Sequence, residues 1–346
     1  MNSFRTTPQT KNLRCKPISL LWLFVVVVSL QAAGQDALED DSAAAAALER
    51  SQELNARQQA LEEMQSEFGI YSPVLIEQYS DLADYFRDAG DQVEAIRFYN
   101  SALQVARIAN GLYSQEQLPV LQRMIESNIE LKDWEEADKL EHLKYHISSR
   151  LYAVDDDDFL LAATKYGDWK LRVVRENLLA LSGRSLTNET EDLSEFYTRI
   201  ITDLETKTDA SQEDLLQMIY GKSLADMALA RAVASTPYTY FQGTVSQYIS
   251  ETRCQNVVNS QGALVRQCYN VQVENPRYRQ SQVDAKQMAV SQYARQVDRS
   301  IEKLQAIASS SVNLTDEQRL ALESHIGELQ TESILIQRSA RRRSLF

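Results

Sequence analysis

Glycine and proline are scarce in this chain. Its 346 residues contain 10 Gly and 6 Pro, which is about half of the combined share usual in globular proteins. Propellers, β-barrels and all-β sandwiches need many tight turns, and tight turns depend on these two residue types, so the composition disfavours such folds. Three Cys and three His also leave little material for a metal centre with several ligands.

The motifs of common catalytic sites are also missing. The sequence has no glycine-rich phosphate loop, no HExxH, no GxSxG and no CxxC. We therefore predict a protein that is not an enzyme and needs no cofactor. The alternative is an enzyme whose site lies in the C-terminal helices and carries no recognisable motif.

Hydrophobic residues make up 44% of the chain and charged residues 25%, which is typical of a globular protein. The formal net charge is −13, and because nucleic-acid binding needs a basic face, the acidic balance argues against a nucleic-acid partner. One basic cluster stands near the end of the chain: Arg338, Arg341, Arg342 and Arg343. We interpret it as cations at a helix C-terminus; the alternative is a peripheral contact with anionic lipid or the cell envelope.

The first 34 residues have the layout of a cleaved secretory signal. They contain no acidic residue, four basic ones before residue 17, an apolar run over Ile18–Leu30 and the small residues Ala32, Ala33 and Gly34. The apolar run has 13 residues, fewer than the roughly 20 that a membrane-spanning helix needs. We expect an exported protein, periplasmic or else secreted; the alternative is an uncleaved anchor.

Export favours pairing the two cysteines that follow the signal, Cys254 and Cys268. Two segments rich in β-branched residues surround them and flank the turn Asn259–Gly262, which predicts a β-hairpin over about 244–273. A register centred on Gln261 places the two cysteines opposite each other. We expect a disulfide rather than a zinc site, for which two ligands are lacking.

Most of the remaining chain has the pattern of helices. A helix rich in Ala, Glu and Gln is expected within residues 35–75, with a frayed start. Residues 76–109 then carry small and aromatic side chains at the spacing of a 34-residue helix–turn–helix repeat. We expect these residues, with one equivalent from the following unit, to pack the helices of each repeat together: Tyr79, Leu82, Ala83, Phe86, Ala95, Tyr99, Ala102 and Ala137.

Two further units follow, at about 118–151 and about 160–180. Ala137 lies 42 residues beyond Ala95, but Glu141 and Lys144 stand where the pattern calls for an aromatic residue and an alanine. Together with Gly69–Pro73 and the segment from Asn110 to Pro119, the pattern resembles exported bacterial tetratricopeptide repeat (TPR) proteins with long, kinesin-light-chain-like repeats. The resemblance covers about residues 60–175 and implies an all-α solenoid of helix pairs.

Long helices are expected in the C-terminal region, 190–346, over 193–207, 211–235, 281–309 and from Thr315 onward. The hairpin would interrupt this helical region as an insertion.

Stacked helix pairs form a curved array whose concave face is lined by the first helix of each pair. The candidate groove positions are mostly acidic: Glu77, Ser80, Asp84, Arg87, Asp88, Gln122, Arg123, Glu126 and Glu130. We predict a protein-interaction scaffold or adaptor in the cell envelope that binds a basic or polar peptide or protein in this groove. The alternatives are ordinary solvated positions, or a structural envelope protein anchored through the hairpin or the arginine tail.

Two candidate cation sites have simpler explanations. His142 and His146 are one helical turn apart and could hold a metal with Asp138 or Glu141, but an exposed helical face is the expected state. The run Asp155–Asp158 could bind a hard cation, yet it lacks the alternation and the glycine of a calcium loop. We predict no metal site.

Overall fold

The computed structural model describes residues 48–207, 212–310 and 314–342, in two units, 1–63 and 64–346. The predicted signal (1–34), the expected helix start near residue 41, and Arg343 lie outside the described residues, and the side chains of Arg341 and Arg342 are not described either. A helix occupies residues 48–68. Within the described ranges, no helix has the length and apolar character needed to cross a membrane.

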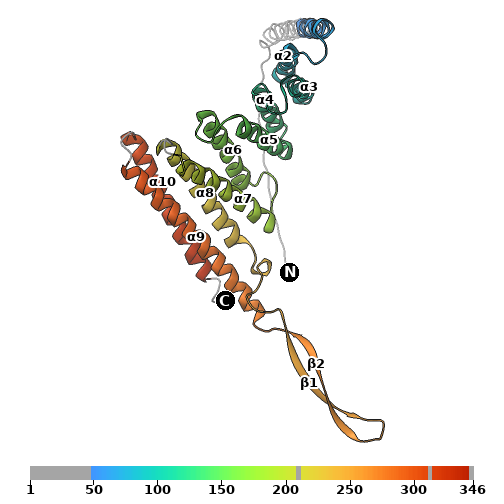
Figure 1. The fold of residues 1–346 in the computed structure, drawn as a ribbon, viewed down its shortest axis with the longest axis vertical. Helices are drawn as coiled ribbons and strands as arrows, with labels where there is room; N and C mark the ends of the chain where they lie inside the picture. Colours follow the sequence, from blue (N-terminus) through green and yellow to red (C-terminus); the bar gives the residue numbers. More distant parts are fainter. Residues whose placement is uncertain (1–47, 208–211, 311–313, 343–346) are drawn as a thin grey trace, which may run out of the picture. The chain divides into compact units, whose positions relative to one another are not determined.

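Helices follow one another from residue 74 onward and are interrupted by one antiparallel hairpin, as the sequence predicts (Figure 1). The elements are α2 (Val74–Asp88), α3 (Gln92–Asn110), α4 (Gln117–Glu130), α5 (Trp134–Leu151), α6 (Asp157–Glu176), α7 (Arg184–Glu205), α8 (Gln212–Ser235), the 3-10 turn η1 (Tyr238–Tyr240), β1 (Tyr248–Val258), β2 (Leu264–Glu274), α9 (Tyr278–Ser310) and α10 (Asp316–Arg342). The fold is therefore all-α with one inserted hairpin.

The turn between α2 and α3 ends one helix and begins the next within three residues. Gly90 adopts a left-handed conformation with φ of 85°, and the N–H of Asp91 donates to the carbonyl of Phe86 at 2.8 Å. The Asp91 side chain then accepts the N–H of Glu94 at 3.1 Å and caps α3. This turn reverses the chain so that α2 and α3 pack side by side.

The turn between α4 and α5 repeats this geometry 42 residues later. Lys132 is left-handed with φ of 59°, the N–H of Asp133 donates to the carbonyl of Asn128 at 2.9 Å, and Asp133 caps α5 through the N–H of Glu136 at 3.2 Å. The two helix pairs are thus structural repeats, and Lys132 occupies the position of Gly90.

The predicted packing residues lie at the helix contacts. Ala83, Ala95, Ala102 and Ala137 are all completely buried, because the paired helices approach closely at these points. Leu82 and Tyr99 are buried beside them, while Tyr79 and Phe86 are partly exposed at the edge of the contact.

Each helix from α2 to α6 contacts the next one along the chain, which is the pattern of stacked helix pairs. Beyond α6 the pattern changes, since α8 contacts α6, α7, α9 and α10. A hydrophobic core of described residues lies among α6–α10. The third predicted unit, about 160–180, lies mostly within the single helix α6, and the next helix, α7, begins at Arg184.

Tyr197 of α7 occupies a site made by two glycines. A Cβ atom added at Gly221 of α8 would lie 2.5 Å from the Tyr197 ring, and one added at Gly167 of α6 would collide with its hydroxyl group. Burial raises the pKa of Tyr197 far above its ordinary value. The absence of a side chain at these two positions is what lets three helices meet around one aromatic ring.

The hairpin has the predicted register. Cys254 pairs with Cys268 and Val257 with Val265, and the two cysteines form a disulfide with a Cα–Cα distance of 4.0 Å. Nearly every residue of both strands is exposed. Among the described elements β1 and β2 pair only with each other, as a long twisted ribbon (Figure 1).

Candidate protein-binding surface of the helix pairs

The first helices of the two repeats are joined by an ion cluster around Asp84. One carboxylate oxygen lies 3.0 Å from Nη1 of Arg87, and the other lies 2.8 Å from Nη1 of Arg123 on α4. The buried Tyr99 hydroxyl donates to the same carboxylate, and burial together with this bond raises the pKa of Tyr99. Asp84 is therefore a structural group that links neighbouring repeats, and its charge is offset by two guanidinium groups.

The pair α4–α5 contains a second cluster. Lys144 is 8% exposed; its Nζ lies 2.9 Å from Oε2 of Glu141 and donates to Oε1 of Gln122 at 2.7 Å. Gln122 in turn donates to Glu126 at 2.8 Å. The two residues that depart from the expected repeat pattern, Glu141 and Lys144, are therefore compatible with burial because they neutralise each other.

A third cluster connects α5, α6 and α7. Asp138 accepts hydrogen bonds from Nε1 of Trp169 at 2.8 Å and from Nζ of Lys170 at 3.0 Å. Lys170 also lies 2.5 Å from a carboxylate oxygen of Glu189. Burial lowers the pKa of Lys170, but the two carboxylates outweigh it and the net shift is upward. We did not predict this cluster from the sequence, because its members come from three different helices.

The nine predicted groove positions fall into different environments. Ser80 is buried and donates to the carbonyl of Ile76 at 2.7 Å, so the prediction that it lines an open groove is wrong. Asp84, Arg87 and Arg123 form the ion cluster. The exposed members are all acidic: Glu77, Asp88, Glu126 and Glu130.

The candidate metal ligands are used in other ways. Nδ1 of His142 lies 3.1 Å from the Tyr166 hydroxyl, and the His146 ring packs edge-on against Tyr113. Asp155 pairs with Lys207 at 3.2 Å, while Asp156 caps α6. In the part of the chain that the structure describes, no three His, Cys, Asp or Glu side chains are grouped so as to hold a metal ion.

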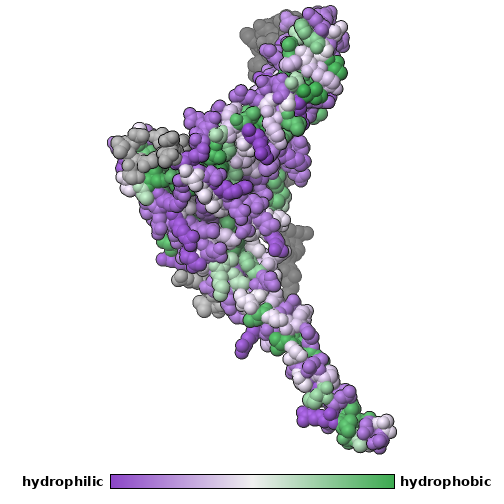
Figure 2. Space-filling model, viewed as in Figure 1, coloured by the Kyte–Doolittle hydropathy of each residue, from purple (hydrophilic) through white to green (hydrophobic). Residues whose placement is uncertain are grey.

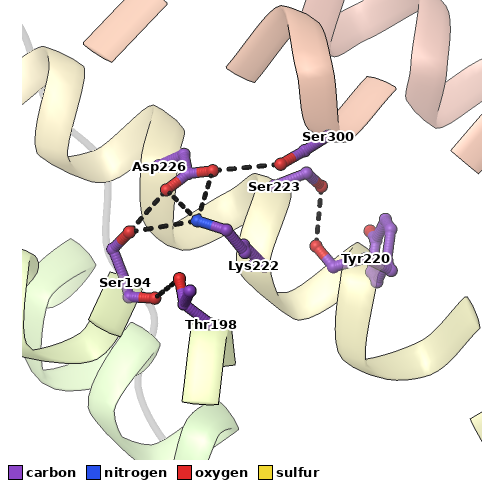
Figure 3. A network of polar contacts seen from close by, with 7 residues as sticks. All are labelled: Ser194, Thr198, Tyr220, Lys222, Ser223, Asp226 and Ser300. Atoms are coloured by element: carbon purple, nitrogen blue, oxygen red, sulfur yellow. Dashed lines mark hydrogen bonds and ion pairs between the residues drawn. The ribbon is translucent and has the colours of Figure 1, made fainter. Parts of the chain in front are cut away.

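The C-terminal helices contain a buried polar network that the sequence analysis missed (Figure 3). Asp226 of α8 is completely buried. It lies 2.8 Å from Nζ of Lys222 and accepts hydrogen bonds from Ser194 of α7 at 2.6 Å and Ser300 of α9 at 3.0 Å. The signal available in the sequence was a Lys and an Asp four residues apart in a largely apolar stretch, Met218–Ala230, of α8. The network ties three helices together.

A pocket of about 490 Å³ lies between α6, α7 and α8, and apolar side chains and three arginines line it. Asp168 is the only carboxyl group among its described lining residues, and burial raises the pKa of this group. A hydrolytic site of the common kind would bring a second carboxyl group, or a nucleophile with its base, into the same pocket.

No protein-family model matches the chain, and no curated protein matches its sequence. Among solved structures, the chain is similar to two crystal structures of a Podosopora anserina kinesin light chain with nearly identical TPR-like repeats, one of them a point variant. The variant is 11% identical, with a TM-score of 0.38 over 53% of this chain and 79% of that one. The other is 10% identical, with a TM-score of 0.36 over 52% of this chain and 88% of that one. We base the helix-pair assignment on the contacts between neighbouring helices described above.

Proposed function

We propose that this protein is a non-enzymatic interaction scaffold that binds a basic or polar peptide, or a protein segment of that kind, along the first helices of its repeats. The observation that carries the proposal is the stacking of the helix pairs α2–α3 and α4–α5. Stacked helix pairs offer an extended surface rather than an enclosed site. A surface of this kind suits an extended chain as ligand.

Charge supports the choice of a basic ligand. Across the groove positions on α2 and α4, five carboxylates face two guanidinium groups. Arg87 and Arg123 are already engaged with Asp84. Of the four exposed carboxylates, Asp88 also lies 3.5 Å from Arg87 and Glu126 accepts a hydrogen bond from Gln122, so a basic ligand would have to compete only with these weak surface contacts. A partner carrying Lys or Arg would be steered toward this surface, most strongly at low salt.

The test uses a fluorescein-labelled peptide of alternating Lys and Ser, with a Glu–Ser peptide for comparison. Fluorescence anisotropy should show binding of the Lys peptide that weakens with salt. The double variant Glu126→Lys/Glu130→Lys should weaken it about tenfold, since each reversal replaces an attraction with a repulsion. Asp84 is left unchanged because its loss would break the ion cluster.

A matched control is Glu302→Lys combined with Glu323→Lys, which reverses two exposed carboxylates on α9 and α10. If this control weakens binding as much as the groove variant, the peptide responds to overall charge and the groove has no special role. Equal affinity for the Lys and Glu peptides would remove the basic-ligand proposal altogether.

We also propose that the protein is exported, and periplasmic. The exposed disulfide supports this, because such bonds persist in oxidising compartments. Mass spectrometry of the protein from its native cells would find a mature N-terminus following Gly34. An intact N-terminus on a chain that fractionates with membranes would favour the uncleaved anchor.

A further inference from the structure

The hairpin has two backbone edges that no described residue pairs with. The N–H of Asn259 donates to the carbonyl of Ala263 at 2.9 Å, and that of Asn275 donates to Gln247 at 2.8 Å. The backbone hydrogen bonds between β1 and β2 are therefore made by the odd-numbered residues. Because the bonding direction alternates along an antiparallel strand, the N–H and C=O groups of the even-numbered residues point away from the partner strand. An edge of this kind is a template for another strand.

The two edges differ in the charges they offer. On β1, Nη2 of Arg253 lies 3.2 Å from Oε2 of Glu251 on the same strand, so these two residues already form an ion pair with each other. On β2, Arg266 and Glu274 are both exposed, they stand eight residues apart, and Asn270 lies midway between them. This symmetric spacing of opposite charges makes the β2 edge complementary to itself.

We propose that two copies of this chain associate through their β2 edges, antiparallel, about a two-fold axis at Asn270. This register places Arg266 of each copy opposite Glu274 of the other. It also places Tyr269 opposite Val271 of the second copy, an aromatic–β-branched pair of the kind that stabilises sheets. The two hairpins then form one four-stranded sheet with isologous contacts.

Other registers lack this complementarity. Axes at Cys268 or Gln272 would also bring outward-directed residues opposite each other. With the first, Arg266 faces Asn270 of the second copy; with the second, Glu274 faces Asn270. No ion pair forms in either case, so the charges select the axis at Asn270.

A second copy also fits the hairpin better than a charged partner would. The four charged residues of the strands, Glu251, Arg253, Arg266 and Glu274, sum to zero, in a chain whose net charge is −13. In the antiparallel arrangement the two Glu274 residues lie about 27 Å apart, at about 3.4 Å per residue. The acidic helical parts therefore lie at opposite ends of the sheet, where their repulsion is weakest.

Association would also extend a mainly apolar face. The odd-numbered positions of both strands are Ile249, Val257, Val265, Tyr269, Val271 and Val273, together with the polar Glu251, Arg253, Gln255 and Gln267, and Figure 2 shows hydrophobic residues gathered at the far end of the hairpin. These side chains share one face of the ribbon. In the four-stranded sheet the two copies of this face become continuous, and the apolar side chains near the axis cover one another.

The test compares two proline variants of the full chain by sedimentation equilibrium. Asn270→Pro removes an outward N–H from the β2 edge, and Thr252→Pro removes one from the β1 edge at the position directly opposite. Both variants lose the same hydrogen bond between Thr252 and Asn270, so they differ only in the edge that is blocked. We expect a dimer for the wild type and for Thr252→Pro, and a monomer for Asn270→Pro.

A charge exchange provides a second test that does not depend on proline being tolerated. Arg266→Glu alone should weaken the dimer about tenfold, since two symmetric pairs are lost, and Arg266→Glu/Glu274→Arg should restore it. A monomeric wild type, a dimer that survives Asn270→Pro, or a double exchange that fails to restore association would each overturn the proposal. Loss of the dimer in Thr252→Pro with retention in Asn270→Pro would assign the interface to β1 and overturn it equally.

Discussion

At the scale of single residues, the two equivalent repeat turns differ by one side chain. Gly90 and Lys132 both have a positive φ, which costs a residue with a Cβ about 1–2 kcal/mol, while glycine adopts it freely but loses more entropy on folding. Lys132→Gly should therefore raise the stability of the second repeat by about 0.5–1 kcal/mol. Thermal denaturation followed by circular dichroism would measure this. The reverse change, Gly90→Lys, should lower the melting temperature, and a fall in both variants would contradict the explanation.

The close approach of α8 to Tyr197 gives a second prediction at this scale. Gly221→Ala should destabilise the chain by about 1–3 kcal/mol, since the added methyl group overlaps a fully buried ring. Gly327 of α10 is the matched control, because a Cβ there meets no atom within 4 Å. Gly327→Ala should stabilise the helix by about 1 kcal/mol. Urea titration would measure the free energy of unfolding of both variants. If both substitutions changed it in the same direction, the packing around Tyr197 would be looser than described.

At the scale of elements, α7, α8 and α9 depend on the network around Asp226. Asp226→Ala would leave Lys222 partly buried without its counter-charge, and we expect a loss of about 3 kcal/mol. Adding Lys222→Met should recover part of this loss, because no uncompensated charge then remains. Chemical denaturation of the wild type, the two single variants and the double variant would give the coupling energy. A coupling near zero would mean that the ion pair contributes nothing beyond its separate residues.

Much of the element order could be predicted from the sequence, for reasons that differ along the chain. Ala83, Ala95 and Ala102 define a close helix contact, and the hairpin register followed from two cysteines placed symmetrically about Gln261. The start of α7 could not be predicted, because Leu186 is the only apolar residue in 184–192 and one residue makes no apolar stripe, so the helix was expected only from Leu193. Contacts with other elements support this part of the helix instead: Glu189 lies 2.5 Å from Nζ of Lys170, and Oγ1 of Thr187 lies 3.4 Å from Oγ1 of Thr236.

The surface was harder to predict than the fold. Asp84 was expected to be a free acidic group, and its partner Arg123 lies 39 residues away on the next repeat. Glu141 and Lys144 lie one turn apart on α5, but their burial, and the bond from Lys144 to Gln122, depend on which side of α5 is covered by α4. Periodicity identifies the side of a helix that is buried, but it does not identify the charged groups that meet once neighbouring helices have packed.

At the scale of the whole molecule, the helices are supported unequally. α8 packs against four other helices, whereas α3 contacts α2 and α4. Amide hydrogen exchange should therefore be slowest in α8 and faster in the α2–α3 pair, since local opening is easiest where fewest contacts are lost. Peptide-resolved exchange measured by mass spectrometry would test this order. Uniform protection across the chain would instead indicate a single cooperative unit.

The position of the disulfide within the hairpin has a consequence for how the chain breaks. Arg266 is exposed and lies inside the covalent ring that Cys254 and Cys268 close. A trypsin-like protease that hydrolyses the peptide bond after Arg266 would sever the backbone without separating the two pieces, because the sulfur bridge spans the cut. The nicked protein would migrate at full size until a reductant released its halves.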